Sequence, residues 1–271
     1  MGTRDGSPLR PRRAAEHSDD GLAEPTSAAP GQALRAGAGH DGGLERRRAI
    51  GALDGASRRD ERTSRPITID VPDYTVLADV VIDPARTALV IVDMQNDFVK
   101  QGGNLLVPDA EATLPAIKHL LGVARANRTR VVYSQDTHRA GDRKWETWPE
   151  HCREGSWGWE IVSELVPEAE DTVIGKLRFD AFYGTSLDHL LRLWSVETLV
   201  ICGTIANISV QWTAASAAQR WYSIVVPRGA ISALEPFDLE ASLHQIALVC
   251  GGQITTATGV RPVDLAAGSR R

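Results

Sequence analysis

Three side chains far apart in the chain could together cleave a bond by nucleophilic attack. Asp93 stands in VDMQNDF, Lys176 in VIGKLRFDAF, and Ser209 near the end of TLVICGTIANISV. A carboxylate can accept and return a proton, and a hydroxyl can attack a carbonyl carbon once a base takes its proton. A lysine beside them adds a compact positive charge whose proton is adjustable. Only four of the 30 basic residues are lysine, which favours a specific role for Lys176 over that of an ordinary surface lysine.

A second group of side chains could bind a divalent metal ion. Asp136 and His138 lie two residues apart in QDTH, and His151 follows in WPEHC. One carboxylate oxygen and two imidazole nitrogens leave coordination positions for water or substrate. The spacing alone is a weak indication, because histidines also serve as hydrogen-bonding or surface residues. The same loop carries four tryptophans that either cover a substrate pocket or pack under the loop, namely Trp145, Trp148, Trp157 and Trp159.

Six short runs rich in β-branched residues alternate with longer amphipathic segments and must position these groups. The predicted strands are residues 88–92, 130–134, 172–175, 198–202, 223–226 and 253–256. The predicted helices are residues 111–126, 159–165, 186–194, 207–220 and 238–249. Apolar strands separated by helices favour a six-stranded, mostly parallel sheet that is covered on both faces, a three-layer α/β/α sandwich.

The candidate catalytic and metal-binding residues share one edge of this predicted sheet. Asp93 follows the first predicted strand, Asp136 and His138 follow the second, Lys176 follows the third, and Ser209 lies just after the fourth. Right-handed crossovers bring the carboxyl ends of parallel strands to one edge, where such sheets bind ligands. The sequence therefore predicts that these residues meet in a single crevice.

The predicted domain spans residues 66–262 and is flanked by two tails. Residues 1–65 contain no aromatic residue and are rich in Arg, Ala, Gly, Ser, Pro and Asp. Such a segment cannot bury enough apolar surface to offset its ordering entropy, so we predict a disordered tail. A wrongly assigned start codon is the alternative explanation. Residues 263–271 are predicted to be a flexible C-terminal tail.

Composition excludes several classes of function. The formal net charge of -5 provides no basic surface for nucleic acid. No segment approaches the roughly 18 apolar residues of a membrane span, and the N-terminus lacks the apolar core of a secretory signal. Cys152, Cys202 and Cys250 match neither a disulfide framework nor a four-cysteine zinc site, and the last two are predicted to be inert core residues. We expect a cytoplasmic protein without nucleic-acid or membrane partners.

Taken together, the motifs resemble the isochorismatase-like cysteine hydrolase superfamily over about residues 87–260, and they occur in the order of that superfamily, with Asp93 first, then the metal loop, Lys176 and the loop of Ser209. The D-x-Q-x-D-F opening at Asp93, the lysine loop at Lys176 and the glycine followed by small residues before Ser209 all carry this resemblance. The D-x-H and W-P-x-H-C motifs of the metal loop look like the nicotinamidase branch. The chain departs from the superfamily at Ser209, where the nucleophile is usually cysteine.

The resemblance implies a Rossmann-like sandwich that hydrolyses a small amide to an acid and ammonia through a covalent acyl intermediate. Asp93 would then transfer protons. A non-proline cis peptide between Thr204 and Ile205 would aim the amides of Ile205 and Ser209 at the developing oxyanion. Phe98 and Trp148 are candidate walls of the substrate pocket, with core packing as the alternative for both.

The same resemblance suggests the cofactor and the assembly state. Asp136, His138 and His151 would hold zinc or a similar ion, which in the nicotinamidase branch binds a ring nitrogen of the substrate. No organic cofactor is expected. Members of the superfamily are commonly dimers or tetramers, so a homo-oligomer is the default expectation.

Ser209 leaves several interpretations open. The chain could be a working serine amidase, a cysteine enzyme whose nucleophile was deliberately replaced, or a member that lost covalent catalysis. A carboxyl group with an ordinary pKa of about 4 is a poor base for serine unless burial raises that pKa. Two further alternatives need no nucleophile. One is isochorismatase-type vinyl ether hydrolysis, in which Asp93 protonates the substrate, and the other is a catalytically silent protein that binds a ligand or oligomerises.

Overall fold

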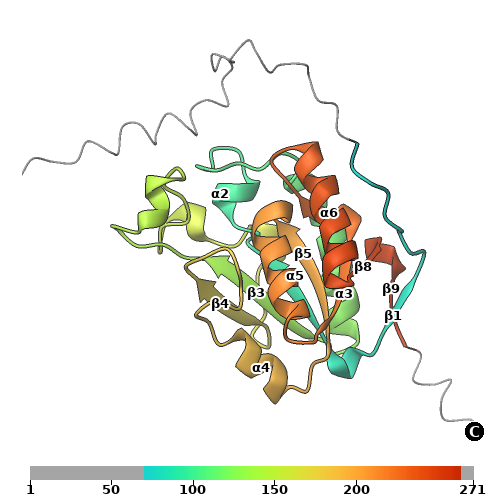
Figure 1. Ribbon diagram of the computed structural model, residues 1–271. Coiled ribbons are helices and arrows are strands. Elements are labelled where there is room, and N and C mark those ends of the chain that lie inside the picture. The colour runs from blue at the N-terminus through green and yellow to red at the C-terminus, as the bar shows by residue number, and fades with distance from the viewer. Residues whose placement is uncertain (1–69, 264–271) are drawn as a thin grey trace, which may run out of the picture. The chain divides into compact units, whose positions relative to one another are not determined.

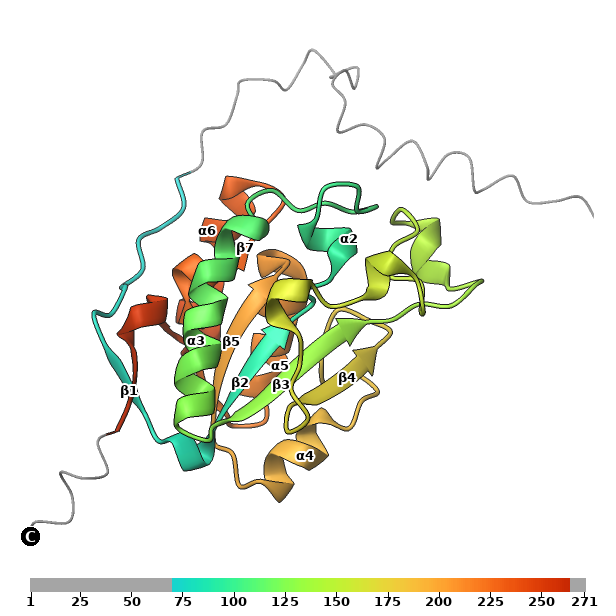
Figure 2. The same cartoon turned by 180° about the vertical axis from the view of Figure 1, so that it is seen from behind.

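The computed structural model describes residues 70–263, in which a parallel sheet lies between helices (Figures 1 and 2). The strand order is β4-β3-β2-β5-β6-β8, with the short β7 paired to β5, and every pairing is parallel. The strands are β2 (Thr87–Val92), β3 (Arg130–Asp136), β4 (Thr172–Lys176), β5 (Thr198–Thr204), β6 (Ser223–Pro227), β7 (Ile231–Ser232) and β8 (Gln253–Thr255). A separate parallel pair consists of β1 (Val80–Ile82) and β9 (Val260–Pro262).

Helices cover both faces of the sheet. Figure 1 shows α5 and α6 in front of the strands, and Figure 2, from behind, shows α3 in front. The helices are α2 (Asn96–Val99), α3 (Leu114–Ala126), α4 (Leu187–Leu193), α5 (Gln211–Ala218) and α6 (Pro236–Cys250). The predicted three-layer α/β/α architecture is therefore confirmed, and the sheet has one strand more than the predicted six because of the two-residue β7.

The predicted helix at residues 159–165 is wrong. Two separate 3₁₀ turns, η5 (Trp157–Trp159) and η6 (Ser163–Leu165), flank an extended segment in which Ile161 forms an antiparallel bridge with Gln95. The amide of Val162 donates to the carbonyl of Met94 at 3.0 Å. This pairing with the chain just after β2 satisfies the backbone groups that a helix would have satisfied internally, and so it overrides the local apolar spacing.

The segment predicted as a helix over residues 207–220 begins differently from an α-helix. A π-helical turn, η7 (Ala206–Val210), precedes α5, and the amide of Val210 donates to the carbonyl of Ile205 at 3.2 Å. π-Helical turns often occur at functional sites. This one carries Ser209.

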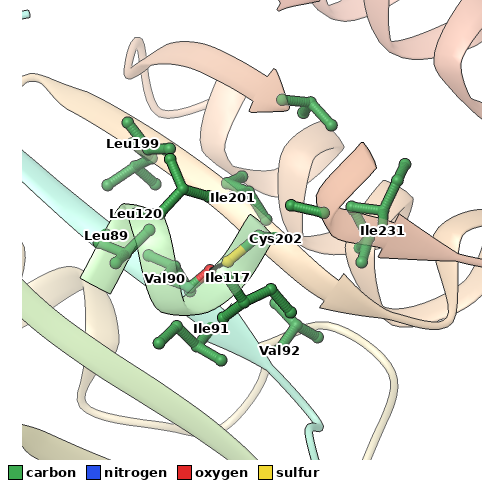
Figure 3. Close-up of a cluster of buried hydrophobic side chains, with 14 of the residues drawn as sticks. Leu89, Val90, Ile91, Val92, Ile117, Leu120, Leu199, Ile201, Cys202 and Ile231 are labelled. Atoms are coloured by element: carbon green, nitrogen blue, oxygen red, sulfur yellow. Dashed lines mark hydrogen bonds between the residues drawn. The ribbon is translucent and has the colours of Figure 1, made fainter. Parts of the chain in front are cut away.

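The buried core lies on both faces of the sheet, and one part of it lies between α3 and the two central strands, β2 and β5. Figure 3 shows Leu89 and Ile91 of β2 with Ile201 of β5 and Ile117 of α3, all of them buried. Burying a side chain of this size contributes about 1.5–3 kcal/mol.

Near the end of β5, Gly203 has a φ of 113°. A Cβ on Gly203 would lie 2.1 Å from the carbonyl oxygen of Val92. The close approach of β2 and β5 thus requires glycine where the two strands lead into the site.

The structure describes residues 70–262 of the predicted domain, residues 66–262. The predicted tails, residues 1–65 and 263–271, lie outside the described residues except for Val263. Between residues 70 and 263, no helix combines the length and apolar character needed to cross a bilayer.

Candidate active site

The carboxyl ends of four neighbouring strands carry the predicted site residues. Asp93 follows β2 directly, Asp136 and Lys176 are the last residues of β3 and β4, and these two are paired in register. Ser209 lies in η7, which follows β5. Figure 2 shows the arrowheads of β2, β3, β4 and β5 at the same edge of the sheet, with α2 beyond them. The parallel topology therefore brings residues separated by more than 100 positions to one edge.

Lys176 is buried between two carboxylates. Its Nζ lies 2.7 Å from Oδ2 of Asp93 and 3.2 Å from Oδ1 of Asp136, and it also donates to the carbonyl of Arg178 at 3.1 Å. Burial acts to lower the pKa of Lys176, but the charges of Asp136 and Asp93 outweigh it and raise this pKa above its ordinary value. Lys176 is thus a buried ammonium group and not an ordinary surface lysine.

Asp93 is the carboxyl group best suited to proton transfer. Burial raises its pKa above the ordinary value, and the negative charge of Asp136 raises it further, whereas the Lys176 ammonium and the Ser209 hydroxyl lower it. Its hydrogen-bonding partners include Ser134, whose Oγ donates to Oδ1 at 3.4 Å. A carboxylate with a raised pKa takes a proton from a neighbouring hydroxyl more readily than an exposed one does.

Asp93 and Ser209 line one narrow cavity. The volume that the centre of a water molecule can occupy in this cavity is only about 10 Å³. This is roughly enough for one water molecule. The predicted wall residues Phe98 and Trp148 both border it, and so do Ile205, Asp136 and His151. A substrate must therefore displace side chains to enter. The cavity is completed by four residues that the sequence did not identify, Leu105, Lys144, Phe179 and Ile208.

The loop that leads to Ser209 has the backbone feature that the family resemblance implies. The peptide bond between Thr204 and Ile205 is cis. Ile205 and Ser209 are both buried and both border the cavity. That their amides form an oxyanion hole remains a prediction.

The predicted metal-binding residues converge on one carboxylate oxygen. Oδ2 of Asp136 lies 3.0 Å from Nε2 of His138 and 3.3 Å from Nε2 of His151. The other nitrogen of each ring is hydrogen-bonded, with Nδ1 of His138 donating to Asp142 at 2.8 Å and Nδ1 of His151 donating to the carbonyl of Pro149 at 2.6 Å. Metal-binding histidines are typically oriented in this way by their second nitrogen.

These residues fit a divalent ion of the zinc type. One donor atom from each of Asp136, His138 and His151 lies within 4.8 Å of the others, and all three residues are buried. Among the described residues 70–263, no group forms a hydrogen bond with the buried Nε2 of His151, which lies 3.3 Å from Oδ2 of Asp136. A buried nitrogen of this kind is costly unless it binds something, and nitrogen and oxygen donors suit zinc.

Asp136 differs electrostatically from Asp93. Burial acts to raise its pKa, but Lys176, His138, His151 and Lys144 together hold this pKa well below the ordinary value. Asp136 therefore remains a carboxylate in the folded protein.

Lys144 is the most important residue that the sequence did not identify. Its Nζ lies 2.6 Å from Oδ2 of Asp136, the same oxygen that faces the two histidines. The rarity of lysine in this chain, which drew attention to Lys176, could also have identified Lys144.

Several neighbouring polar residues have structural contacts. The carboxylate of Asp97 accepts hydrogen bonds from the amides of Asn104 at 2.9 Å and Cys152 at 2.6 Å. The side chain of Gln95 donates to the carbonyls of Asp136 and Trp159, each at 2.8 Å. These bonds join the segment after β2 to the end of β3 and the loop that follows it.

The tryptophans and cysteines contribute less than their number suggests. Among the four tryptophans of the loop, only Trp148 borders the cavity. Cys152 is buried, and burial raises the pKa of its thiol, so it is a poor substitute for the missing nucleophilic cysteine. Cys202 is buried as predicted, whereas Cys250 is only partly buried.

The sequence profile of the isochorismatase domain matches residues 87–258, a range that contains all these site residues. The chain belongs to the isochorismatase family. It is 30% identical over 190 residues to the ureidoacrylate amidohydrolase RutB of Serratia proteamaculans, which corresponds to 60% of this chain and 77% of that relative.

Solved structures of the family have the same fold. N-carbamoylsarcosine amidase from Thermoplasma acidophilum is 34% identical with a TM-score of 0.59, covering 64% of this chain and 96% of that one. Pyrazinamidase of Pyrococcus horikoshii, solved in complex with zinc, is 25% identical with a TM-score of 0.56, covering 66% and 99%. These findings confirm the predicted family and support the prediction of a hydrolase that acts on C–N bonds.

Proposed function

We propose that this isochorismatase-family protein hydrolyses the C–N bond of a small amide, with Ser209 as the nucleophile. The observation that carries the proposal is that Asp93 and Ser209 border one narrow cavity while Lys176 binds Asp93 at 2.7 Å. The related proteins whose names state an activity on amides support the reaction class.

The first half of the reaction forms an acyl-enzyme. Asp93 takes the proton of the Ser209 hydroxyl as Oγ attacks the carbonyl carbon of the amide. The tetrahedral intermediate then collapses with cleavage of the C–N bond, and Asp93 gives its proton to the leaving nitrogen. The raised pKa of Asp93 suits a group that must take and return a proton in turn.

The second half releases the acid. Water attacks the acyl ester of Ser209 while Asp93 takes one of its protons. The ester C–O bond breaks, and the proton returns to Oγ of Ser209. Acid and ammonia leave, and each group regains its starting protonation.

Lys176 and the backbone would stabilise the charges that appear in these steps. The Lys176 ammonium holds the Asp93 carboxylate in place and compensates its charge within a buried site. The amides of Ile205 and Ser209 would donate to the oxyanion, and each such donor is worth roughly 3 kcal/mol.

A metal ion would add a second means of holding the substrate. Asp136, His138 and His151 would bind it, and the ion would supply Lewis-acid chemistry by orienting and polarising a substrate donor atom. The steps assigned to Asp93, Lys176 and Ser209 involve only protein groups.

Ammonia release from a panel of amides tests the proposal. Ureidoacrylate and N-carbamoylsarcosine represent open-chain substrates, and pyrazinamide represents ring substrates. The wild-type protein should release ammonia from at least one of them, and Ser209→Ala should not. Ser223→Ala, which changes an exposed serine, is the matched control and should behave like the wild type.

Ser209→Cys separates the remaining interpretations. Activity in both the wild-type protein and this variant supports a serine amidase. Activity in Ser209→Cys alone shows that serine disables a cysteine site and contradicts the proposed nucleophile. If neither protein releases ammonia, assays with isochorismate then distinguish vinyl ether hydrolysis by Asp93 from a silent ligand-binding protein.

The cytoplasmic location and the homo-oligomeric state remain predictions. Light scattering after size-exclusion chromatography gives the subunit count directly. A monomeric mass at assay concentration would contradict the predicted assembly.

A further inference from the structure

Lys144 reaches into the group of residues that could bind a metal ion. It belongs to the 3₁₀ turn η4 (Arg143–Glu146), yet its side chain is only 9% exposed. Its Nζ lies 2.6 Å from Oδ2 of Asp136 and 4.9 Å from the centre of the Phe179 ring. A carboxylate and an aromatic face are both favourable neighbours for a desolvated ammonium.

The loop is built in a way that directs Lys144 inward. Asp142 caps η4 by accepting a hydrogen bond from the amide of Lys144 at 2.9 Å. Its other carboxylate oxygen accepts from Nδ1 of His138 at 2.8 Å. One residue thus orients both the lysine and a candidate metal ligand. The Lys144 contact therefore results from the fold of the loop and is not a chance position of a long surface side chain.

Lys144 contacts the carboxylate oxygen of Asp136, Oδ2, that a metal ion at this group would bind. Among the groups around Oδ2 of Asp136, Lys144 makes the shortest contact, compared with 3.0 Å for His138 and 3.3 Å for His151. A divalent cation bound to this oxygen would lie close to the ammonium in a buried site, where charges of the same sign repel strongly. Lys144 and a metal ion therefore compete for Asp136.

We propose that Lys144 is the resident cation of the Asp136–His138–His151 group and that a divalent ion binds there only when Lys144 is displaced. The chain then has two states of this group, one closed by its own lysine and one that holds a metal ion. The affinity for the ion is reduced by the free energy needed to move Lys144 away from Asp136 and Phe179.

Zinc titration of three metal-free proteins tests this competition. Lys144→Met keeps the length of the side chain and removes its charge. Lys118→Met makes the same change at an exposed lysine of α3 and serves as the matched control. We expect Lys144→Met to bind Zn²⁺ at least about tenfold more tightly than the wild type, because the repulsion is gone, and Lys118→Met to match the wild type. Isothermal titration calorimetry measures the affinities without any assay of activity.

A double variant assigns the gained affinity to this group. His151→Ala in the Lys144→Met background should remove the gain. Zn²⁺ affinities that agree within twofold between wild type and Lys144→Met overturn the proposal, as does failure of both proteins to bind the ion. A gain that survives His151→Ala also overturns it, because the ion would then lie elsewhere.

The unmodified protein provides a test that does not depend on how the variant folds. In a crystal of wild-type protein soaked with Zn²⁺, Nζ of Lys144 should lie outside hydrogen-bonding distance of Asp136 wherever the ion is bound. An ion and Lys144 bound together to Oδ2 of Asp136 would contradict the proposal.

Discussion

Two buried aspartates, Asp93 and Asp136, share one lysine but have opposite electrostatic character. Both carboxylates contact Lys176, at 2.7 and 3.2 Å. The pKa of Asp93 is raised, with burial as the main cause, whereas the pKa of Asp136 is held well below the ordinary value despite burial. The difference comes from their neighbours, because Asp136 also contacts Lys144 and two histidines.

This contrast separates two tasks within one site. A carboxyl group whose pKa lies above its ordinary value can exchange a proton during a reaction, while one surrounded by donors and cations stays charged and holds its partners. We therefore propose that the Asp93 side transfers protons and that the Asp136 side binds cations. The following predictions test the contrast, beginning with the largest expected effect.

Removing the charge of Asp93 should nearly abolish catalysis. For Asp93→Asn we expect ammonia release to fall by about 10³-fold, or ~4 kcal/mol in activation free energy, because the amide cannot accept the serine proton. Initial rates at saturating substrate measure the loss. Activity within tenfold of the wild type would show that another group is the base and would remove the proposed distinction between the two aspartates.

Removing the charge of Asp136 should mainly reduce stability. For Asp136→Asn we expect the free energy of unfolding to fall by about 3 kcal/mol, because Lys144 loses its carboxylate partner and Lys176 keeps only one of its two carboxylate partners, Asp93. Urea denaturation in the presence of a chelator measures the change. Asp109→Asn, at an exposed aspartate, is the control, and an equal loss in both variants would contradict the role of Asp136 as a buried anion.

The two aspartates should affect the pH dependence of stability in opposite directions. We expect this effect to be smaller than the losses of activity and stability described above. A depressed folded pKa stabilises the protein above the unfolded pKa of about 4, and this stability is lost as pH falls through the folded pKa. A raised folded pKa does the reverse, so its contribution is lost as pH rises through the folded value. Asp136→Asn should therefore weaken the loss of stability toward acid, and Asp93→Asn should weaken the loss toward neutral pH. Urea midpoints measured from pH 3 to 7 test both expectations. If the pH dependence of the midpoint changed in the same direction in both variants, the proposed contrast between the two aspartates would be wrong.

Exposed charges in the loop after β3 should have little effect on stability or activity. Arg139 and Glu154 form an ion pair at 2.6 Å with exposed side chains, and solvent screens such pairs. Arg139→Ala should leave both the urea midpoint and the rate of ammonia release unchanged within error. A clear loss of activity would extend the functional region to the surface of the loop.

Local patterns were sufficient for much of the fold and the site. Apolar runs predicted six of the seven strands of the main sheet, because a strand buried on both faces must be apolar along its length. Asp93, Asp136 and Lys176 were identified because a charged group directly after such a strand is unusual. The helix predicted at residues 159–165 failed because its backbone pairs with the segment after β2, and that partner lies more than 60 positions away in the sequence.

The sequence by itself determined which chemical groups reach the carboxyl edge of the sheet, since parallel strands joined by right-handed crossovers leave little choice in where their ends lie. Only the tertiary structure decided that Asp93 and Asp136 differ in pKa and that Lys144 shares Asp136 with the histidines. These properties depend on burial and on contacts at 2.6–3.3 Å between separate elements, and electrostatic interactions inside a protein change steeply over such distances.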